Sequence, residues 1–180
     1  MPKSTVVDHA VLQQRQQALE QDLADLITQY HHQLGQSIPA YVVEQVRQVC
    51  TQQEAALFLR LGDPEQRRLV QLVRQLAQAL GEELGRHPLG DTLTTLEERV
   101  TPYLQASERQ LNQLLALVNM GPVTLKLWEA EVGSPPLRTL KAQWQVCQSK
   151  LAAVHRQLET AQAKAQVQAA IDKWDQWVAG

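Results

Sequence analysis

Histidine and carboxylate side chains at helical spacing can bind a metal ion or transfer protons, and this chain has few such pairs. Glu83 and His87 are four residues apart, and a single pair of this kind usually makes only a surface contact. His31 and His32 are adjacent, so on a helix their imidazoles point in different directions and do not chelate one ion. The sequence contains no His-Glu-x-x-His motif, no Cys-x-x-Cys pair and no glycine-rich phosphate loop. We therefore expect neither a bound metal nor a cofactor.

The two cysteines, Cys50 and Cys147, each occupy an apolar position of an expected helix, and neither has a base nearby at helical spacing. The serines stand in no recognisable nucleophile elbow. Two isolated cysteines in a chain of this length are typical of small core residues in a reducing compartment. The sequence thus predicts no catalytic residues, and we expect the protein not to be an enzyme.

A cluster of arginines brackets an expected turn between two helices. A positive charge near a helix start opposes the helix dipole, so a nearby anion would stabilise the cluster. The anion could be a neighbouring carboxylate such as Glu65 or a phosphate of a binding partner. No aromatic side chain is interleaved with the cluster, so stacking on the bases of single-stranded nucleic acid is not indicated. The candidate anion contacts are Arg60, Arg67, Arg68 and Arg74.

Trp174 and Trp177 are three residues apart, on one face of an expected helix. Tryptophan is costly to leave in water and is enriched among the residues that dominate binding at interfaces. Two interpretations remain open: both indoles pack on the protein's own helices, or both anchor a partner. Asp172 and Asp175 lie beside them, where the end of a helix disfavours negative charge, and this favours a neighbouring positive charge.

Glycine, proline and capping residues divide the chain into helices. Gly35 should end the first helix, with Pro39 at the start of the second. In the third helix Asp63 is expected to cap the first turn, with the Gln66 side chain reaching back. Apolar residues at three- and four-residue spacing fill the segments between these breaks. The expected helices cover residues 8–34, 39–61, 63–86, 91–118, 123–132 and 137–179.

The last expected helix is much longer than the others. Residues 137–179 contain neither glycine nor proline, and one helix of this length would extend about 64 Å. Its apolar residues keep the spacing of a coiled-coil seam. They are Leu137, Leu140, Trp144, Cys147, Leu151, Val154, Leu158, Ala161 and Ala165, and the spacing resumes at Val167, Ile171, Trp174 and Val178.

These patterns predict an all-α fold, an antiparallel bundle of four to five helices with a long, coiled-coil-like C-terminal helix. We assign residues 1–133 to the bundle, and residues 134–180 to the long helix, packed on the bundle and extending beyond it. A compact chain of this size has a radius of gyration of about 16 Å, so the last helix should overhang it. A second copy of the chain is the simplest partner for the overhanging part.

Composition and charge narrow the classes of partner. Glutamine accounts for 27 of the 180 residues, which gives long helical surfaces that are polar but weakly charged. The net charge is −2, too low for bulk attraction to nucleic acid, although residues 134–180 carry six basic and three acidic side chains. A nucleic-acid-associated helical subunit is thus an alternative that the sequence does not favour. No apolar run approaches membrane-spanning length, so we expect no membrane partner and a cytoplasmic location.

Taken together, the sequence predicts a non-enzymatic protein–protein interaction module: an adaptor, assembly factor or scaffold subunit. We expect it to form a homodimer through residues 137–179, whereas the sequence does not identify any other protein partner. The predicted interface residues are Trp144, Leu151, Leu158, Ile171, Trp174 and Trp177.

The glutamine content, the long final helix and the pair Trp174/Trp177 loosely resemble McdB-type adaptors, which partner ParA-like ATPases in positioning carboxysomes. The resemblance implies a third function, an adaptor for a ParA-type positioning ATPase. The chain departs from that pattern at its N-terminus, where such adaptors are expected to carry a longer, charged and flexible arm.

Overall fold

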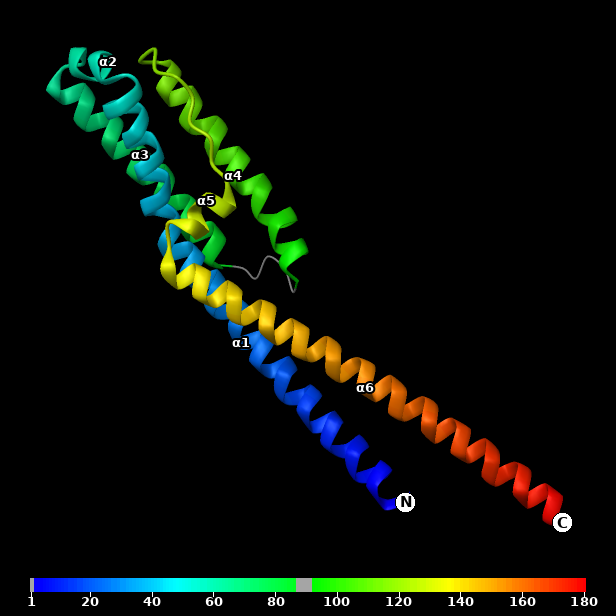
Figure 1. The fold of residues 1–180 in the computed structure, drawn as a ribbon. Coiled ribbons are helices and arrows are strands. Elements are labelled where there is room, and N and C mark those ends of the chain that lie inside the picture. Colours follow the sequence, from blue (N-terminus) through cyan, green and yellow to red (C-terminus); the bar gives the residue numbers. More distant parts are fainter. Residues whose placement is uncertain (1, 87–91) are drawn as a thin grey trace. The chain divides into compact units, whose positions relative to one another are not determined.

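The computed structural model describes the backbone of residues 2–86 and 92–180, and the side chains of residues 9–86 and 92–180 (Figure 1). Over these residues the chain forms six α-helices and one short π-helix, without strands, which confirms the predicted all-α class. The long C-terminal helix is also confirmed. The elements are α1 (Pro2–Gln48), the π-helix η1 (Val49–Gln53), α2 (Ala55–Arg60), α3 (Asp63–Arg86), α4 (Leu93–Ala116), α5 (Leu127–Val132) and α6 (Pro135–Ala179).

The chain divides into two compact units, and each is described by itself. The central unit comprises Leu26–Ala142, and the α1/α6 unit comprises Met1–Asp25 with Gln143–Gly180. Our assignment of residues 1–133 and 134–180 to separate parts stays a prediction.

Helix α1 runs without interruption through Gly35 and Pro39, so the predicted break between a first and a second helix is wrong. A proline inside a helix removes one donor and crowds the carbonyl four residues earlier, here that of Gly35. Gly81 of α3 packs directly on this point. A Cβ atom on Gly81 would lie 2.5 Å from the Gly35 oxygen and 2.7 Å from Cγ of Pro39. The α3 backbone therefore covers the carbonyl that Pro39 leaves without its usual donor.

The start of α3 lies where the sequence predicts it, but a different pair of residues caps it. Glu65 reaches back to accept a hydrogen bond from the Gly62 N–H at 2.9 Å, as in a capping box. The Gln66 side chain reaches further and donates to the carbonyls of Phe58 and Leu61, at 2.9 and 3.2 Å. Gln66 thus ties the end of α2 to the start of α3.

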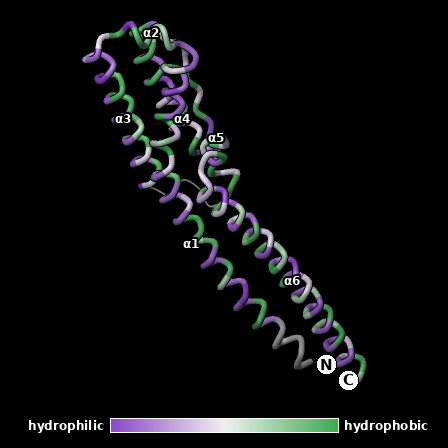
Figure 2. The backbone as a smooth tube through the Cα atoms, turned by 60° about the vertical axis from the view of Figure 1, so that its left-hand side comes forward, coloured by the Kyte–Doolittle hydropathy of each residue, from purple (hydrophilic) through white to green (hydrophobic). Residues whose placement is uncertain are grey.

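The core of the central unit is built from α1, α3 and α4, with α5 and the segment before it. Hydrophobic residues recur along these helices at the spacing of one buried face (Figure 2). The largest fully buried side chains include Tyr30, Leu34, Ile38 and Val42 of α1, Leu84 of α3, and Leu96, Val100, Leu104, Leu111 and Leu115 of α4.

Between α4 and α5 the chain forms an extended strap, residues 120–126, where the sequence predicts the start of a helix at 123. Pro122 and the β-branched Val123 and Thr124 disfavour helix there. Alternate residues of this stretch point into the core, so Val123 and Leu125 are buried. The predicted helix over 123–132 is therefore confirmed only as α5.

Side chains of the helices take the place of a neighbouring strand along the strap. Asn112 accepts from the N–H of Val123 at 2.8 Å and donates to the Val123 carbonyl at 3.2 Å. The N–H groups of Gly121, Leu125 and Lys126 donate to Glu54, Glu108 and Tyr41, at 2.7, 2.9 and 2.9 Å. The strap thus satisfies its buried backbone groups without a β-sheet.

In the α1/α6 unit two helices pack antiparallel. Cys147 Sγ lies 3.4 Å from the Leu19 carbonyl oxygen, and Gln16 Nε2 lies 3.4 Å from His155 Nε2, so residue numbers fall along α1 as they rise along α6. Beyond these contacts the two helices diverge toward the ends of the chain (Figure 1). Among the residues of this unit whose side chains the structure describes, only Trp144, Cys147 and Val154 are buried.

Candidate interaction surfaces

The predicted interface residues of α6 fall into three environments. Trp144 is fully buried within the chain, at 0% exposure, and Leu151 and Leu158 are partly buried. Ile171, Trp174 and Trp177 are exposed, the two indoles at 71% and 76%. The structure thus brings Trp144, Leu151 and Leu158 against the chain itself and leaves the three distal residues uncovered.

The exposed residues form what we call the distal stripe: Val167, Ile171, Trp174, Trp177 and Val178. All residues from 162 to 180 are exposed, although hydrophobic residues continue to the end of α6 (Figure 2). The two indoles alone expose roughly 300 Å², since a tryptophan has about 150–250 Å² to bury. That area already matches the lower end of the largest apolar patch on a typical monomer, about 300–600 Å². The distal stripe is therefore large enough to indicate an interaction site.

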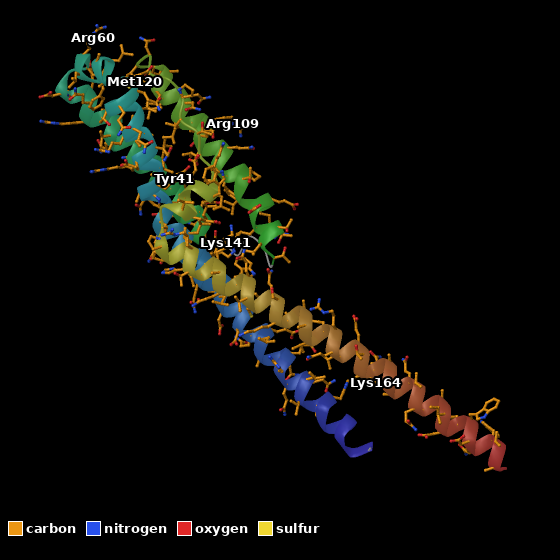
Figure 3. The ribbon with its side chains drawn as sticks, viewed as in Figure 1. Tyr41, Arg60, Arg109, Met120, Lys141 and Lys164 are labelled. Atoms are coloured by element: carbon orange, nitrogen blue, oxygen red, sulfur yellow. The ribbon has the colours of Figure 1, made fainter. Side chains whose placement is uncertain are left out.

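Among the described residues, none of the four predicted anion contacts forms an ion pair with a carboxylate. In the described part of the chain the ion pairs are Arg47–Glu44 and Lys141–Glu131, and neither includes Arg60, Arg67, Arg68 or Arg74. All four side chains are exposed, and Arg60 lies at the end of α2 (Figure 3). Glu65 accepts the Gly62 N–H and, among the described residues, forms no ion pair with these arginines. The interpretation that it neutralises the cluster stays a prediction.

A pocket of 250 Å³ opens beside this cluster, between α1, η1, α2 and α3. Val46, Cys50, Phe58 and Val73 contribute to its apolar lining, and Arg47 and Arg74 bring guanidinium groups to it. Of the four predicted arginines only Arg74 lines the pocket. Arg47 was not singled out from the sequence, because the predicted helix over 39–61 gave no sign that its face would meet α3.

The π-helix η1 forms one wall of this Arg-lined pocket. Its closing hydrogen bond runs from the N–H of Glu54 to the carbonyl of Val49 at 2.8 Å, one residue beyond α-helical spacing. Such wide turns often occur at functional sites. Burial raises the pKa of the Cys50 thiol, and the negative charge of Glu54 adds to the effect. Cys50 therefore stays a protonated, apolar lining residue and has no thiolate character at neutral pH.

The candidate metal-binding residues from the sequence do not come together as a site in the described ranges, and one of them lies outside those ranges. His87, of the Glu83–His87 pair, is among the residues that the structure does not describe. Within the described ranges no three His, Cys, Asp or Glu side chains lie close enough to hold a metal ion. In those ranges also no helix has the length and apolar character needed to cross a membrane.

A buried polar network in the central unit was not foreseen from the sequence. The Tyr30 hydroxyl donates to the buried carboxylate of Glu131 at 2.7 Å, and Lys141 donates to the same carboxylate at 2.7 Å. Tyr30 and Glu131 are 101 residues apart, so no local pattern links them. Burial, followed by the hydrogen bond from Tyr30 to Glu131, raises the pKa of the Tyr30 hydroxyl far above its ordinary value. The network therefore fixes α5 to α1.

No protein-family model matches this chain, and no curated protein or solved structure is detectably similar to it. The resemblance to McdB-type adaptors accordingly stays a prediction.

Proposed function

We propose that the protein is a non-enzymatic interaction module, an adaptor or scaffold subunit, that self-associates through the distal half of α6. One observation carries the proposal: beyond Val154, the last buried residue of α6, the apolar spacing slips by two residues after Ala165 and resumes on another face of the helix as the exposed distal stripe. A seam of this type is stable when a second helix covers it. Trp174 and Trp177 supply the rigid aromatic anchors on which binding energy concentrates.

A comparison of the expected free energies indicates which residues of the distal stripe must take part in the interface. Covering the indoles of two copies removes roughly 600 Å² of apolar surface from water, which contributes about 15 kcal/mol. Association costs about 4–15 kcal/mol in lost translational and rotational freedom. Indole burial alone therefore does little more than offset this cost, and the aliphatic residues must supply the surplus. Ile171 and Val178 are thus part of the expected interface.

The test is the solution mass of the full chain across a range of concentrations, by light scattering after size exclusion. We expect masses above the 20.3 kDa of one chain, and 20.3 kDa for a distal variant carrying Ile171→Gln, Trp174→Gln and Val178→Gln. Glutamine is a good helix former, so the variant keeps α6. The matched control carries Leu117→Gln, Trp128→Gln and Val132→Gln, which replace equally exposed residues of the central unit. A wild-type chain that stays at 20.3 kDa, or a control that loses mass equally, would refute the proposal.

A further inference from the structure

In the described part of the chain, two sets of charged side chains are poorly matched by opposite charge: Asp172 and Asp175 form no ion pair, and of Arg47 and Arg74 only Arg47 forms one. The first lies on α6, where Asp175 borders the distal stripe beside Ile171 and Val178, and Asp172 lies on the side of the helix away from Trp174. Neither forms an ion pair within the described part of the chain, and Asp172 only accepts a hydrogen bond from Gln168 at 2.9 Å. Two carboxylates in the last turns of a helix also oppose its dipole. The end of α6 is therefore an exposed aromatic segment whose aspartates a nearby positive charge would stabilise.

The second set surrounds the Arg-lined pocket of the central unit. Arg74 has no carboxylate partner, and Arg47 has only the exposed Glu44, three residues earlier at 3.1 Å. Arg67 is seven residues before Arg74 on α3 and therefore extends the same charged face. The half-exposed Val70 lies between them and also lines the pocket. The pocket thus combines an apolar floor with a positively charged rim that a bound anionic group would stabilise.

The size of the pocket suits an indole. Its 250 Å³ is roughly eight times the 30 Å³ that one water molecule takes up in the liquid, and an indole has nine ring atoms besides hydrogen. The Trp174 side chain would fill such a space, and Asp175, at the edge of the distal stripe, would meet the guanidinium groups at the rim. Arginine can hold a carboxylate with two parallel hydrogen bonds, which makes such a contact specific as well as attractive.

We propose that the distal end of α6 of one copy inserts Trp174 into the Arg-lined pocket of a second copy, with Asp175 paired to the guanidinium groups of Arg47 and Arg74. This inference rests on the self-association proposed above and names the receptor for the distal stripe. A symmetric pairing of two distal stripes would cover the indoles but leave the arginines without an anion. Docking in the pocket accounts for both sets of side chains.

A contact between two different surfaces has a consequence for assembly. Each docked pair still presents one free distal stripe and one free pocket, so association continues into open chains or closed rings. The mass should therefore rise with concentration beyond that of a dimer. It should fall with added salt, because the ion pairs at the rim of the pocket are partly exposed and are screened.

The test uses two variants of the full chain that each lack one surface. The distal variant is Ile171→Gln/Trp174→Gln/Val178→Gln, and the pocket variant is Arg47→Glu/Arg74→Glu, whose positions are exposed and outside the core. Circular dichroism checks that both keep their helix content. We expect each variant alone to be monomeric, at 20.3 kDa, and an equimolar mixture to give a heterodimer of twice that mass and nothing larger. The mixture stops there because each pair has only one intact distal stripe and one intact pocket.

Charge exchange sharpens the test. We expect Asp175→Arg to weaken assembly of the full chain several-fold, and the same change combined with Arg47→Glu/Arg74→Glu to restore it. Failure of the combined variant to recover would overturn the assigned charge pairing.

Other outcomes separate this inference from the proposal on which it rests. If the pocket variant assembles like the wild type while the distal variant does not, docking in the pocket is wrong and self-association stands. If the wild type is monomeric at every concentration, both fail. If a fluorescent single-stranded oligonucleotide binds the wild type, is lost from the pocket variant and leaves assembly unchanged, the arginines serve a nucleic acid and docking in the pocket is overturned.

Discussion

The central unit and the α1/α6 unit are both built from helices with apolar positions, but they bury these positions to very different extents. In the central unit, parts of α1, α3 and α4 bury a continuous hydrophobic face, and a strap and a polar network join distant segments. In the α1/α6 unit, two helices bury three of the described side chains, Trp144, Cys147 and Val154. Beyond residue 161 of α6 every side chain is exposed.

The difference follows from geometry. A helix with one apolar stripe needs neighbours on that stripe, and three or more helices can enclose a core that two cannot. The α1/α6 unit therefore resembles half of a helical bundle: the seam near Trp144 is covered within the chain, and the stripe at Trp174, on another face of α6, is open. Burial at Trp144 stabilises the fold, whereas the open stripe carries the self-association proposed above.

The largest expected effect separates two tryptophans of one helix. Trp144→Ala removes a fully buried indole and should lower the free energy of unfolding by about 3–5 kcal/mol. Trp174→Ala removes an indole that is 71% exposed, and under conditions where the chain is monomeric it should change stability by less than about 0.5 kcal/mol. Urea unfolding followed by far-ultraviolet circular dichroism measures both. Equal losses for the two variants would mean that the distal stripe is covered within its own chain.

A smaller effect is expected in the polar network of the central unit. Tyr30→Phe removes the hydrogen bond to the buried Glu131 carboxylate and should cost about 1.5–3 kcal/mol at neutral pH. The hydroxyl also links stability to pH. Because its pKa is higher in the folded chain than the ordinary 10.0, its contribution is complete below pH 10.0 and is lost as the pH rises above that value.

The pH dependence provides the check on this second prediction. The melting temperature of the wild type should fall steeply as the pH rises above about 10. Tyr30→Phe should start from a lower melting temperature but lose less of it over the same range. Burial, with the hydrogen bond to Glu129, also raises the pKa of Tyr41, so part of the alkaline loss should persist in the variant. Parallel curves for the two proteins would show that Tyr30 does not titrate differently in the folded state.

The close approach of α1 and α3 predicts that alanine substitutions at two glycines of α3 change stability in opposite directions. Gly81→Ala would place a methyl group 2.5 Å from the Gly35 oxygen, so we expect a loss of about 1–3 kcal/mol from overpacking. Gly85→Ala, four residues on, meets its nearest atom at 3.4 Å, an ordinary contact. Alanine there should gain up to about 1 kcal/mol from helix propensity. The same urea unfolding measures both variants, and a loss at Gly85 as large as that at Gly81 would contradict this account of the crossing.

Elements that depend on local signals could be predicted from the sequence, and those that depend on distant neighbours could not. The ends of α3 and the length of α6 follow from glycine, proline and apolar spacing. Pro39 misled the prediction because the packing of Gly81 on Gly35 makes an interior proline tolerable. Residues 123–126 misled it because Asn112 and Glu108, on another helix, hold them extended.

The candidate surfaces show the same limit. Trp174 and Trp177 could be identified from the sequence because they stand on one face of a helix with no break. Arg74 was identified as part of a charge cluster, but its proximity to Arg47 and to an apolar pocket depends on how α1 and α3 pack. Arg47 and Arg74 are 27 positions apart. Their approach to the same pocket could not be predicted without knowing that α1 continues through Pro39.

The last expected effect is of similar size and concerns the strap, which the α1/α6 unit lacks among its described residues. Asn112 both accepts from and donates to the backbone of Val123, so Asn112→Ala breaks two hydrogen bonds, each worth about 0.5–1.5 kcal/mol. Its neighbour Gln113 is exposed, and Gln113→Ala is the matched control, expected within about 0.5 kcal/mol of the wild type. Hydrogen exchange at the Val123 amide should rise in the first variant and stay unchanged in the second. A rise confined to this part of the chain would show that the strap opens locally, whereas a rise throughout the central unit would show that the strap folds together with its core.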